Sequence, residues 1–160
     1  MNWALRRLAS AAGWGLACSF FVFGNQAMAD IGKLCVFSEI TGVIRLQGQP
    51  VEGATVTRTH DYRKPASDQA TTDVDGAFSF PAVFERALTS LLPMELVIAQ
   101  RLTVSYQGQD YLIWSNTKRS RAENTELGGL PLTLTCELTD ELRLHREFGS
   151  ILRTNCVWTE

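Results

Sequence analysis

The chain has 160 residues, with 15 lysines and arginines against 17 aspartates and glutamates, and a formal net charge of −2 at pH 7. This mildly acidic balance lacks the basic surface on which nucleic-acid binding depends, so we expect no nucleic-acid partner. The length suits a single domain. After the first 29 residues, no apolar run approaches the roughly 20 residues that cross a membrane as a helix.

The first 29 residues have the pattern of a secretory signal peptide. Arg6 and Arg7 precede an apolar run, which ends in the small-residue sequence AMA at residues 27–29. A charged segment, an apolar segment and a cleavage site of this type define such peptides. We therefore expect cleavage after residue 29, a periplasmic location without stable membrane insertion, and one domain over residues 30–160. That domain has 13 basic and 17 acidic residues, a net charge of 13 − 17 = −4.

Three cysteines remain after cleavage: Cys35, Cys136 and Cys156. In an oxidising compartment they allow at most one internal disulfide. We favour Cys136–Cys156, because a short return between two late strands brings these residues together most easily, and Cys35 would then be a buried, inert thiol. The sequence allows all three pairings, and the second choice is Cys35–Cys156, which would tie the two ends of the domain together. No spacing is C-x-x-C, so a zinc site is not expected.

The residues after the signal peptide form short β-branched and aromatic runs separated by glycine and proline, a pattern typical of an all-β fold. A first strand is expected from Val36-Phe37 and then residues 42–46, and a second over residues 54–59. Residues 60–70 are polar and contain a proline, and we expect them to form a loop.

The sequence TTDVDGAFSF, at residues 71–80, has two interpretations. A calcium loop of the EF-hand type needs a glutamate at its twelfth position, where this chain has Ala82. A tight turn between two strands needs only an Asp-Gly pair, which supplies the positive φ angles of a two-residue hairpin, and a side chain such as Asp73 to bond nearby amides. We therefore predict a turn without a metal, followed by a strand with Phe78 and Phe80 on one face.

After Pro81 the spacing of apolar residues changes. Between Val83 and Leu92 they recur with a helical period. Because Pro93 cannot continue a helix, we predict one short helix that ends before it.

Strands resume after this predicted helix. Residues 115–130 are polar and glycine-rich, which predicts a long loop, and Gly108 lies in a predicted hairpin turn. The strands are expected at residues 96–98, 102–106, 111–114, 132–138 and 156–158.

Residues 42–80 resemble the carboxypeptidase-regulatory-like, transthyretin-like domain. The resemblance rests on the patterns G-x-P-V-x-G-A-x-V and T-D-x-D-G-x-F-x-F. The first is matched by Gly48, Pro50, Val51, Gly53, Ala54 and Val56, and the second by Thr72, Asp73, Asp75, Gly76, Phe78 and Phe80. The resemblance implies an all-β Greek-key sandwich of seven or eight strands. Such domains occur as scaffolds, as binding modules and occasionally as enzymes.

The longer arrangement, with LCVFS near the start, VFERALTSLLP in the middle and LTCEL near the end, resembles a family of small exported bacterial proteins. Some members are encoded near type VI secretion effectors, where exported partners serve as immunity proteins. The resemblance therefore implies a secreted effector or toxin as a partner.

Catalysis is not expected from this sequence. Its two histidines, His60 and His145, lie far apart and without a metal-ligand spacing. His60-Asp61-Tyr62 could be a base with its orienting group, but no separate nucleophile accompanies it, so a solvated loop histidine is favoured. We expect a non-enzyme without catalytic residues, metal or cofactor.

Two segments are candidates for binding a partner: the predicted loop around Tyr62, and the basic run that follows Trp114. Tyrosine, tryptophan and arginine are enriched at interface hot spots. The competing interpretations are core packing for the aromatic residues and a solvated loop for the basic ones. The candidate residues are His60, Tyr62, Arg63, Trp114, Lys118, Arg119 and Arg121.

Three functions remain open at this point. The favoured one is a protein-binding module, most concretely an immunity protein that occludes an effector acting in the periplasm. The second is binding of a small ligand, such as a glycan stacked on Trp114 or Tyr62, and the third is a structural envelope module. An exposed aromatic platform would favour a small ligand, whereas a mixed polar loop surface would favour a protein partner.

Overall fold

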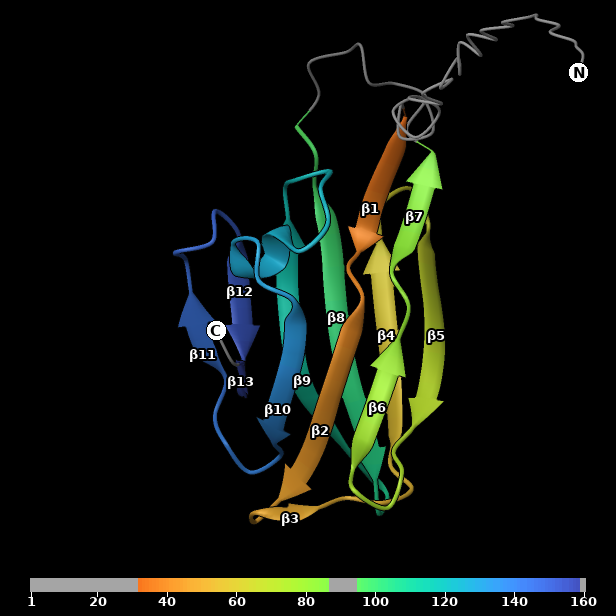
Figure 1. Cartoon of the computed structure of the whole chain (residues 1–160), viewed down its shortest axis with the longest axis vertical. Helices are drawn as coiled ribbons and strands as arrows, with labels where there is room; N and C mark the ends of the chain where they lie inside the picture. The colour runs from red at the N-terminus through yellow and green to blue at the C-terminus, as the bar shows by residue number, and fades with distance from the viewer. Residues whose placement is uncertain (1–31, 87–94, 159–160) are drawn as a thin grey trace, which may run out of the picture.

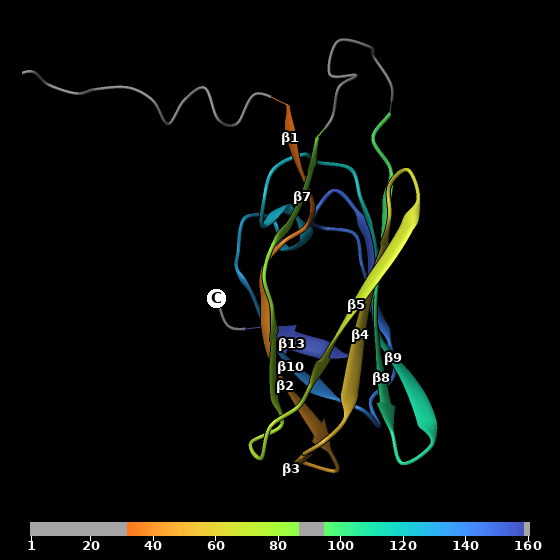
Figure 2. The same cartoon turned by 90° about the vertical axis from the view of Figure 1, so that its right-hand side faces the viewer.

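The computed structural model describes residues 32–86 and 95–158. The predicted signal peptide lies outside the described residues. Within them the chain is all-β, with strands β1 to β13 and one short 3-10 turn. The strands lie in two layers that face each other (Figures 1 and 2). The predicted fold class is therefore confirmed at the level of an all-β fold.

One layer is a five-stranded sheet extended by a two-stranded one. The five-stranded sheet has the order β13-β10-β2-β3, with β6 also paired to β2, and β1 pairs with β7. Strands β10 and β2 run parallel, whereas the other pairs in this layer are antiparallel. The bounds are β1 Lys33–Phe37, β2 Ile40–Leu46, β3 Gln49–Pro50, β6 Ala77–Phe80, β7 Val83–Arg86, β10 Leu132–Glu137 and β13 Cys156–Trp158.

The other layer is a six-stranded antiparallel sheet with the order β11-β12-β9-β8-β4-β5. Alternate residues of its central strands point into the molecule, as in a half-buried sheet. The bounds are β4 Thr55–Asp61, β5 Pro65–Thr71, β8 Ile98–Tyr106, β9 Gln109–Lys118, β11 Arg143–His145 and β12 Ile151–Thr154.

The hydrophobic core lies between the two layers. Both layers contribute fully buried side chains to it, and burial of this apolar surface is the main force that holds the layers together. The largest of these side chains is Trp114, and other members are Phe37, Ile44, Leu102, Ile113 and Leu132.

The predicted turn at Asp73 is confirmed. Its Oδ1 accepts hydrogen bonds from the backbone amides of Asp75 (2.9 Å) and Ala77 (2.8 Å). Gly76 has φ +74°, and a Cβ there would lie 2.5 Å from the carbonyl oxygen of Ile44, so this position requires glycine. The expected two-residue hairpin is not formed, however, because the flanking strands β5 and β6 belong to different sheets, and the turn carries the chain from one layer to the other.

Several predicted elements differ from the structure. The predicted first strand, from Val36 to Leu46, is divided into β1 and β2, which belong to different sheets, and the strands predicted at 96–98 and 102–106 are replaced by the single strand β8. The loop predicted at residues 60–70 instead contains the end of β4 and most of β5, an edge strand that is exposed along nearly all its length and therefore lacks the alternation of a half-buried strand. Residues 83–86, predicted as the start of a helix, form β7, which pairs with β1. The rest of the predicted helix, including residues 87–92, falls outside the described residues.

The remaining predictions concern the second half of the chain. The hairpin at Gly108 is confirmed: residues 107 and 108 have φ 50° and 77°, typical of a tight two-residue hairpin turn. The predicted loop at 115–130 is shorter than expected, because β9 continues to Lys118 and residues 125–127 form a 3-10 turn, η1 (Thr125–Leu127).

The cysteines also match their prediction. Cys136 and Cys156 form a disulfide that joins β10 to β13, and Cys35 is a buried free thiol. In the described part of the chain, no helix is long and apolar enough to cross a membrane.

Candidate functional site

Two of the predicted binding residues are not on the surface. Trp114 is 0% exposed and belongs to the hydrophobic core, and Lys118 is 1% exposed. Both lie on β9, where Trp114, Asn116 and Lys118 alternate with more exposed residues and point inward together. The surface role expected for Trp114 and Lys118 is therefore incompatible with their burial.

Lys118 belongs to a buried charged cluster centred on Glu126, which is 0% exposed. The Nζ of Lys118 donates to Oε2 of Glu126 at 2.8 Å, and Oγ of Ser38 donates to the same oxygen at 2.7 Å. The other oxygen, Oε1, accepts hydrogen bonds from Nε2 of Gln100 (2.9 Å) and from the backbone amide of Ser38 (3.1 Å). The carboxylate thus has a charge partner and several hydrogen bonds, which buried ions require.

The electrostatics of this cluster keep Glu126 ionised. Burial raises the pKa of its carboxyl group, but the charge of Lys118 and the hydrogen bonds from Lys118, Gln100 and Ser38 outweigh burial, so the pKa is lowered. Burial raises the pKa of the neighbouring Cys35 thiol, and Lys118 only partly offsets this. Cys35 is thus a protonated, unreactive thiol at neutral pH.

The exposed members of the two predicted segments lie at one end of the molecule. Tyr62, in the β4–β5 turn, packs against a small buried cluster formed by Leu34, Val36 and Ile98. The carbonyl oxygen of Arg121, in the segment after β9, accepts a hydrogen bond from the backbone amide of Cys35 at 3.0 Å. Figure 1 shows both segments at the end where β1 begins.

We call Tyr62, Arg63, Arg119 and Arg121 the end surface. Arg63 and Arg121 are exposed, and Tyr62 is partly buried. The guanidinium of Arg63 lies 5.3 Å from the centre of the Tyr62 ring, within the range of a cation–π contact. Arg119 donates to the carboxylate of Glu95 at 2.7 Å. The end surface is therefore mixed and polar, with one aromatic ring.

His60 does not belong to the end surface. It is 7% exposed and points inward, with Nε2 3.8 Å from Oε1 of Glu85 on β7. Its Nδ1 is buried without a hydrogen-bond partner among the described residues. His60 therefore faces the inside of the molecule, contrary to the surface role expected from the sequence.

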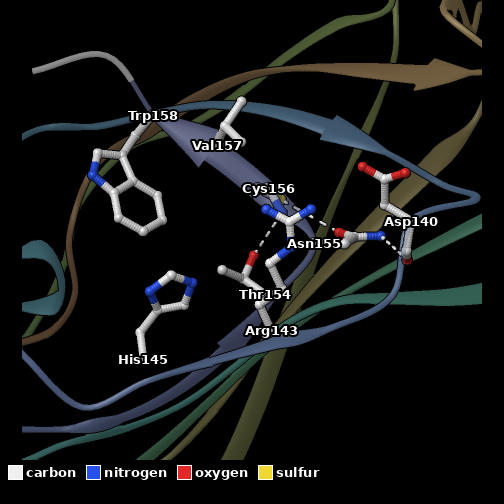
Figure 3. A pocket seen from close by; sticks show the side chains of 8 residues that line it. All are labelled: Asp140, Arg143, His145, Thr154, Asn155, Cys156, Val157 and Trp158. Atoms are coloured by element: carbon white, nitrogen blue, oxygen red, sulfur yellow. Dashed lines mark hydrogen bonds between the residues drawn. The ribbon is translucent and has the colours of Figure 1, made fainter.

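The structure also contains a pocket that the sequence did not indicate. It has a volume of about 290 Å³ and lies where the chain passes from β12 to β13, beside the Cys136–Cys156 disulfide (Figure 3). Its lining residues are Asp140, Arg143, His145, Thr154, Asn155, Cys156, Val157 and Trp158.

Aromatic rings form one wall of this pocket. The ring of Trp158 makes edge contacts with His145 (5.2 Å between centres) and with Phe148 (5.6 Å), which fix its orientation. Nδ1 of His145 lies 2.8 Å from a carboxylate oxygen of Glu147. In the view of Figure 3, Trp158 and His145 lie on one side of the pocket and Asp140 on the other.

Arg143 lies between these two sides in Figure 3. Within the described residues, neither its guanidinium nor the carboxylate of Asp140 takes part in a hydrogen bond or an ion pair. The two groups of opposite charge are thus available to a ligand.

The sequence did not indicate this pocket because most of its lining residues lie on three short strands, β11, β12 and β13. Strands β11 and β13 have three residues each, too few for a period to be recognised. One hint was present: Trp158 follows Cys156 by two residues, so once the disulfide is assigned, the ring lies on the same face of β13 as the bonded sulfur.

Comparison with known proteins gives a family without an assigned function. No curated protein matches the chain, and no solved structure matches it. A family model described as a domain of unknown function, DUF6795, matches residues 40–141, more than half of the chain. That stretch contains the whole end surface, whereas most residues of the pocket follow it. The chain therefore belongs to the DUF6795 family of domains of unknown function.

Proposed function

We propose that this chain is an exported, non-enzymatic module that binds another protein through the end surface. The observation that carries the proposal is that two separate segments, around Tyr62 and around Arg119, lie at the same end of the molecule, where each is held against β1 or its neighbours. Tyrosine and arginine are typical anchors of protein interfaces. A mixed polar loop surface suits a protein partner better than a small ligand.

The backbone below the end surface is held in place before a partner binds. The segment that carries Arg119 and Arg121 is fastened to the buried cluster, because the backbone amide of Asn124 donates to Oγ of Ser38 at 2.8 Å. A surface whose backbone is fixed before binding loses little conformational entropy when a partner docks. Its three arginines favour a partner with acidic groups at the contact.

The kind of partner that we propose is inferred from the sequence. The predicted signal peptide supports action in the periplasm. The resemblance to exported proteins encoded near type VI secretion effectors supports a secreted effector, which this chain would neutralise as an immunity protein. Occlusion needs no chemistry in this chain, only a complementary surface of about 800 Å² per partner.

We also infer that the two layers form a transthyretin-like Greek-key sandwich. The inference is supported by the glycine, proline and aspartate pattern of residues 48–80 and by the turn at Asp73, which joins strands of different layers. An experimental structure would test it by the order and connection of the long strands.

Protein binding can be tested by reversing charges in the end surface and, as a control, at an exposed arginine far from it. The tagged full chain is expressed together with the products of neighbouring genes, and capture and suppression of toxicity are measured. We expect Arg63→Glu combined with Arg119→Glu to abolish both. Arg45→Glu, an exposed site near the far end of β2, should change neither. Equal capture by all three proteins would exclude the end surface as the contact.

A second function, small-ligand binding, is favoured by one observation. The sequence predicts a glycan stacked on Trp114 or Tyr62, but Trp114 is buried in the core. The pocket beside the disulfide instead offers the partly exposed ring of Trp158.

A further inference from the structure

We propose that the pocket beside the disulfide binds a sugar acid of monosaccharide size, a ring that carries one carboxylate and several hydroxyl groups. This proposal does not depend on the end surface. The pocket's volume of about 290 Å³ is at the lower limit of small-molecule sites, which suits one sugar ring rather than a chain.

Arg143 is the group that would bind the carboxylate. Its guanidinium lines the pocket, and its side chain is exposed on β11 without a hydrogen bond or an ion pair to any other described residue. A guanidinium presents two parallel N–H donors that match the two oxygens of a carboxylate. An arginine that is unpaired beside a concave site is thus ready for an anionic ligand.

Trp158 supplies a flat apolar wall for the ring of the ligand. T-shaped contacts with His145 and Phe148 hold the indole in place, so that it need not be ordered when a ligand arrives. A sugar ring has an apolar face of C–H groups that packs well against such a ring, whereas its hydroxyl groups project from the edge.

Asp140 and His145 complete the site. An ionised carboxylate is only an acceptor, so Asp140 would accept hydrogen bonds from hydroxyl groups. Nδ1 of His145 is occupied by Glu147, which leaves Nε2 for the ligand. With Asp140 and Glu147 nearby, one arginine does not balance a multiply charged phosphate compound, so a single carboxylate fits the charges better.

The test compares three probes that differ in one feature each. Protein isolated from cells that express the full chain is titrated with D-glucuronate, with glucose, which lacks the carboxylate, and with cyclohexanecarboxylate, which lacks the hydroxyl groups. Binding is followed by the indole NMR signals, assigned with Trp158→Phe. We expect glucuronate to bind about ten-fold more tightly than either analogue, and to shift the signal of Trp158 but not that of the buried Trp114.

Variants locate the carboxylate contact. We expect Arg143→Gln to weaken glucuronate binding about ten-fold. Arg153→Gln is the matched control, because Arg153 is exposed on the neighbouring strand β12 but does not line the pocket, and it should leave the affinity unchanged. Absence of glucuronate binding, equal binding of cyclohexanecarboxylate, or an unchanged affinity of Arg143→Gln would each overturn the proposal.

Discussion

The end surface and the pocket use the same residue types but support them in different ways. In the end surface, Arg119 is paired with Glu95 and Arg63 lies over Tyr62, and the segment below is fastened to a buried charged cluster. In the pocket, Arg143 has no partner among the described residues, and the wall rests on aromatic packing and a disulfide.

This difference shows that residue type alone does not define a site. Arginines that already contact neighbours form a broad, ordered surface, which suits a large partner. An unpaired arginine beside a concave wall suits a small anion. The end surface depends on buried charges and the pocket on a covalent bond. We therefore expect loss of the disulfide to alter the pocket without abolishing partner binding, and loss of the buried charges to alter the end surface without altering the pocket.

The largest effect is expected from Glu126→Ala. The substitution leaves the ammonium of Lys118 buried without its charge partner, and loss of one member of a buried pair costs about 3–5 kcal/mol in the free energy of unfolding. Urea denaturation would measure it, with Glu123→Ala at an exposed acid of the same segment as control. A loss below about 1 kcal/mol would show that the cluster contributes little.

Removal of the disulfide should have the next largest effect. Cys136 and Cys156 are 20 residues apart, and a loop of this size gives about 3 kcal/mol in the chain-entropy model. We expect the double substitution to serine to lower the free energy of unfolding by about this amount and to alter the NMR signal of Trp158. Capture of the protein partner should persist at protein concentrations and temperatures where the variant remains folded. Loss of partner binding in a folded variant would show that the two regions are coupled.

A smaller effect is expected from pH. The pKa of Glu126 is lowered in the folded state from its ordinary value of 4.5, so its ionised form stabilises the fold above pH 4.5, and this contribution is lost as the pH falls through the lowered pKa. The free energy of unfolding of the wild type minus that of Glu126→Gln should therefore shrink below pH 4.5. A difference that stays constant from neutral to acidic pH would contradict the assigned direction.

The elements that were predicted correctly are those with local causes. The turn at Asp73 and the hairpin at Gly108 each follow from a few neighbouring residues. The disulfide pairing was also predicted correctly, but the chain between its cysteines is not a short return, because it forms β11 and β12 in the other sheet. The all-β class followed from composition in the same way.

The elements that were missed depend on distant partners. Strand β7 forms because β1 pairs with it, and β5 is an edge strand without a buried face. Lys118 was assigned to a loop, although Trp114, Asn116 and Lys118 at intervals of two would share one face if the strand continued. Glu126, its charge partner, gave no local sign of burial.

The central claim is that a protein partner contacts the end surface, and hydrogen exchange of the wild-type complex tests it most directly. Exchange at backbone amides would be compared with and without the partner captured by the tagged chain. We expect slower exchange at residues 61–64 and 119–124, and no change at the pocket or at the β2–β3 end. Protection confined to the pocket or to the outer face of the six-stranded sheet would contradict the claim.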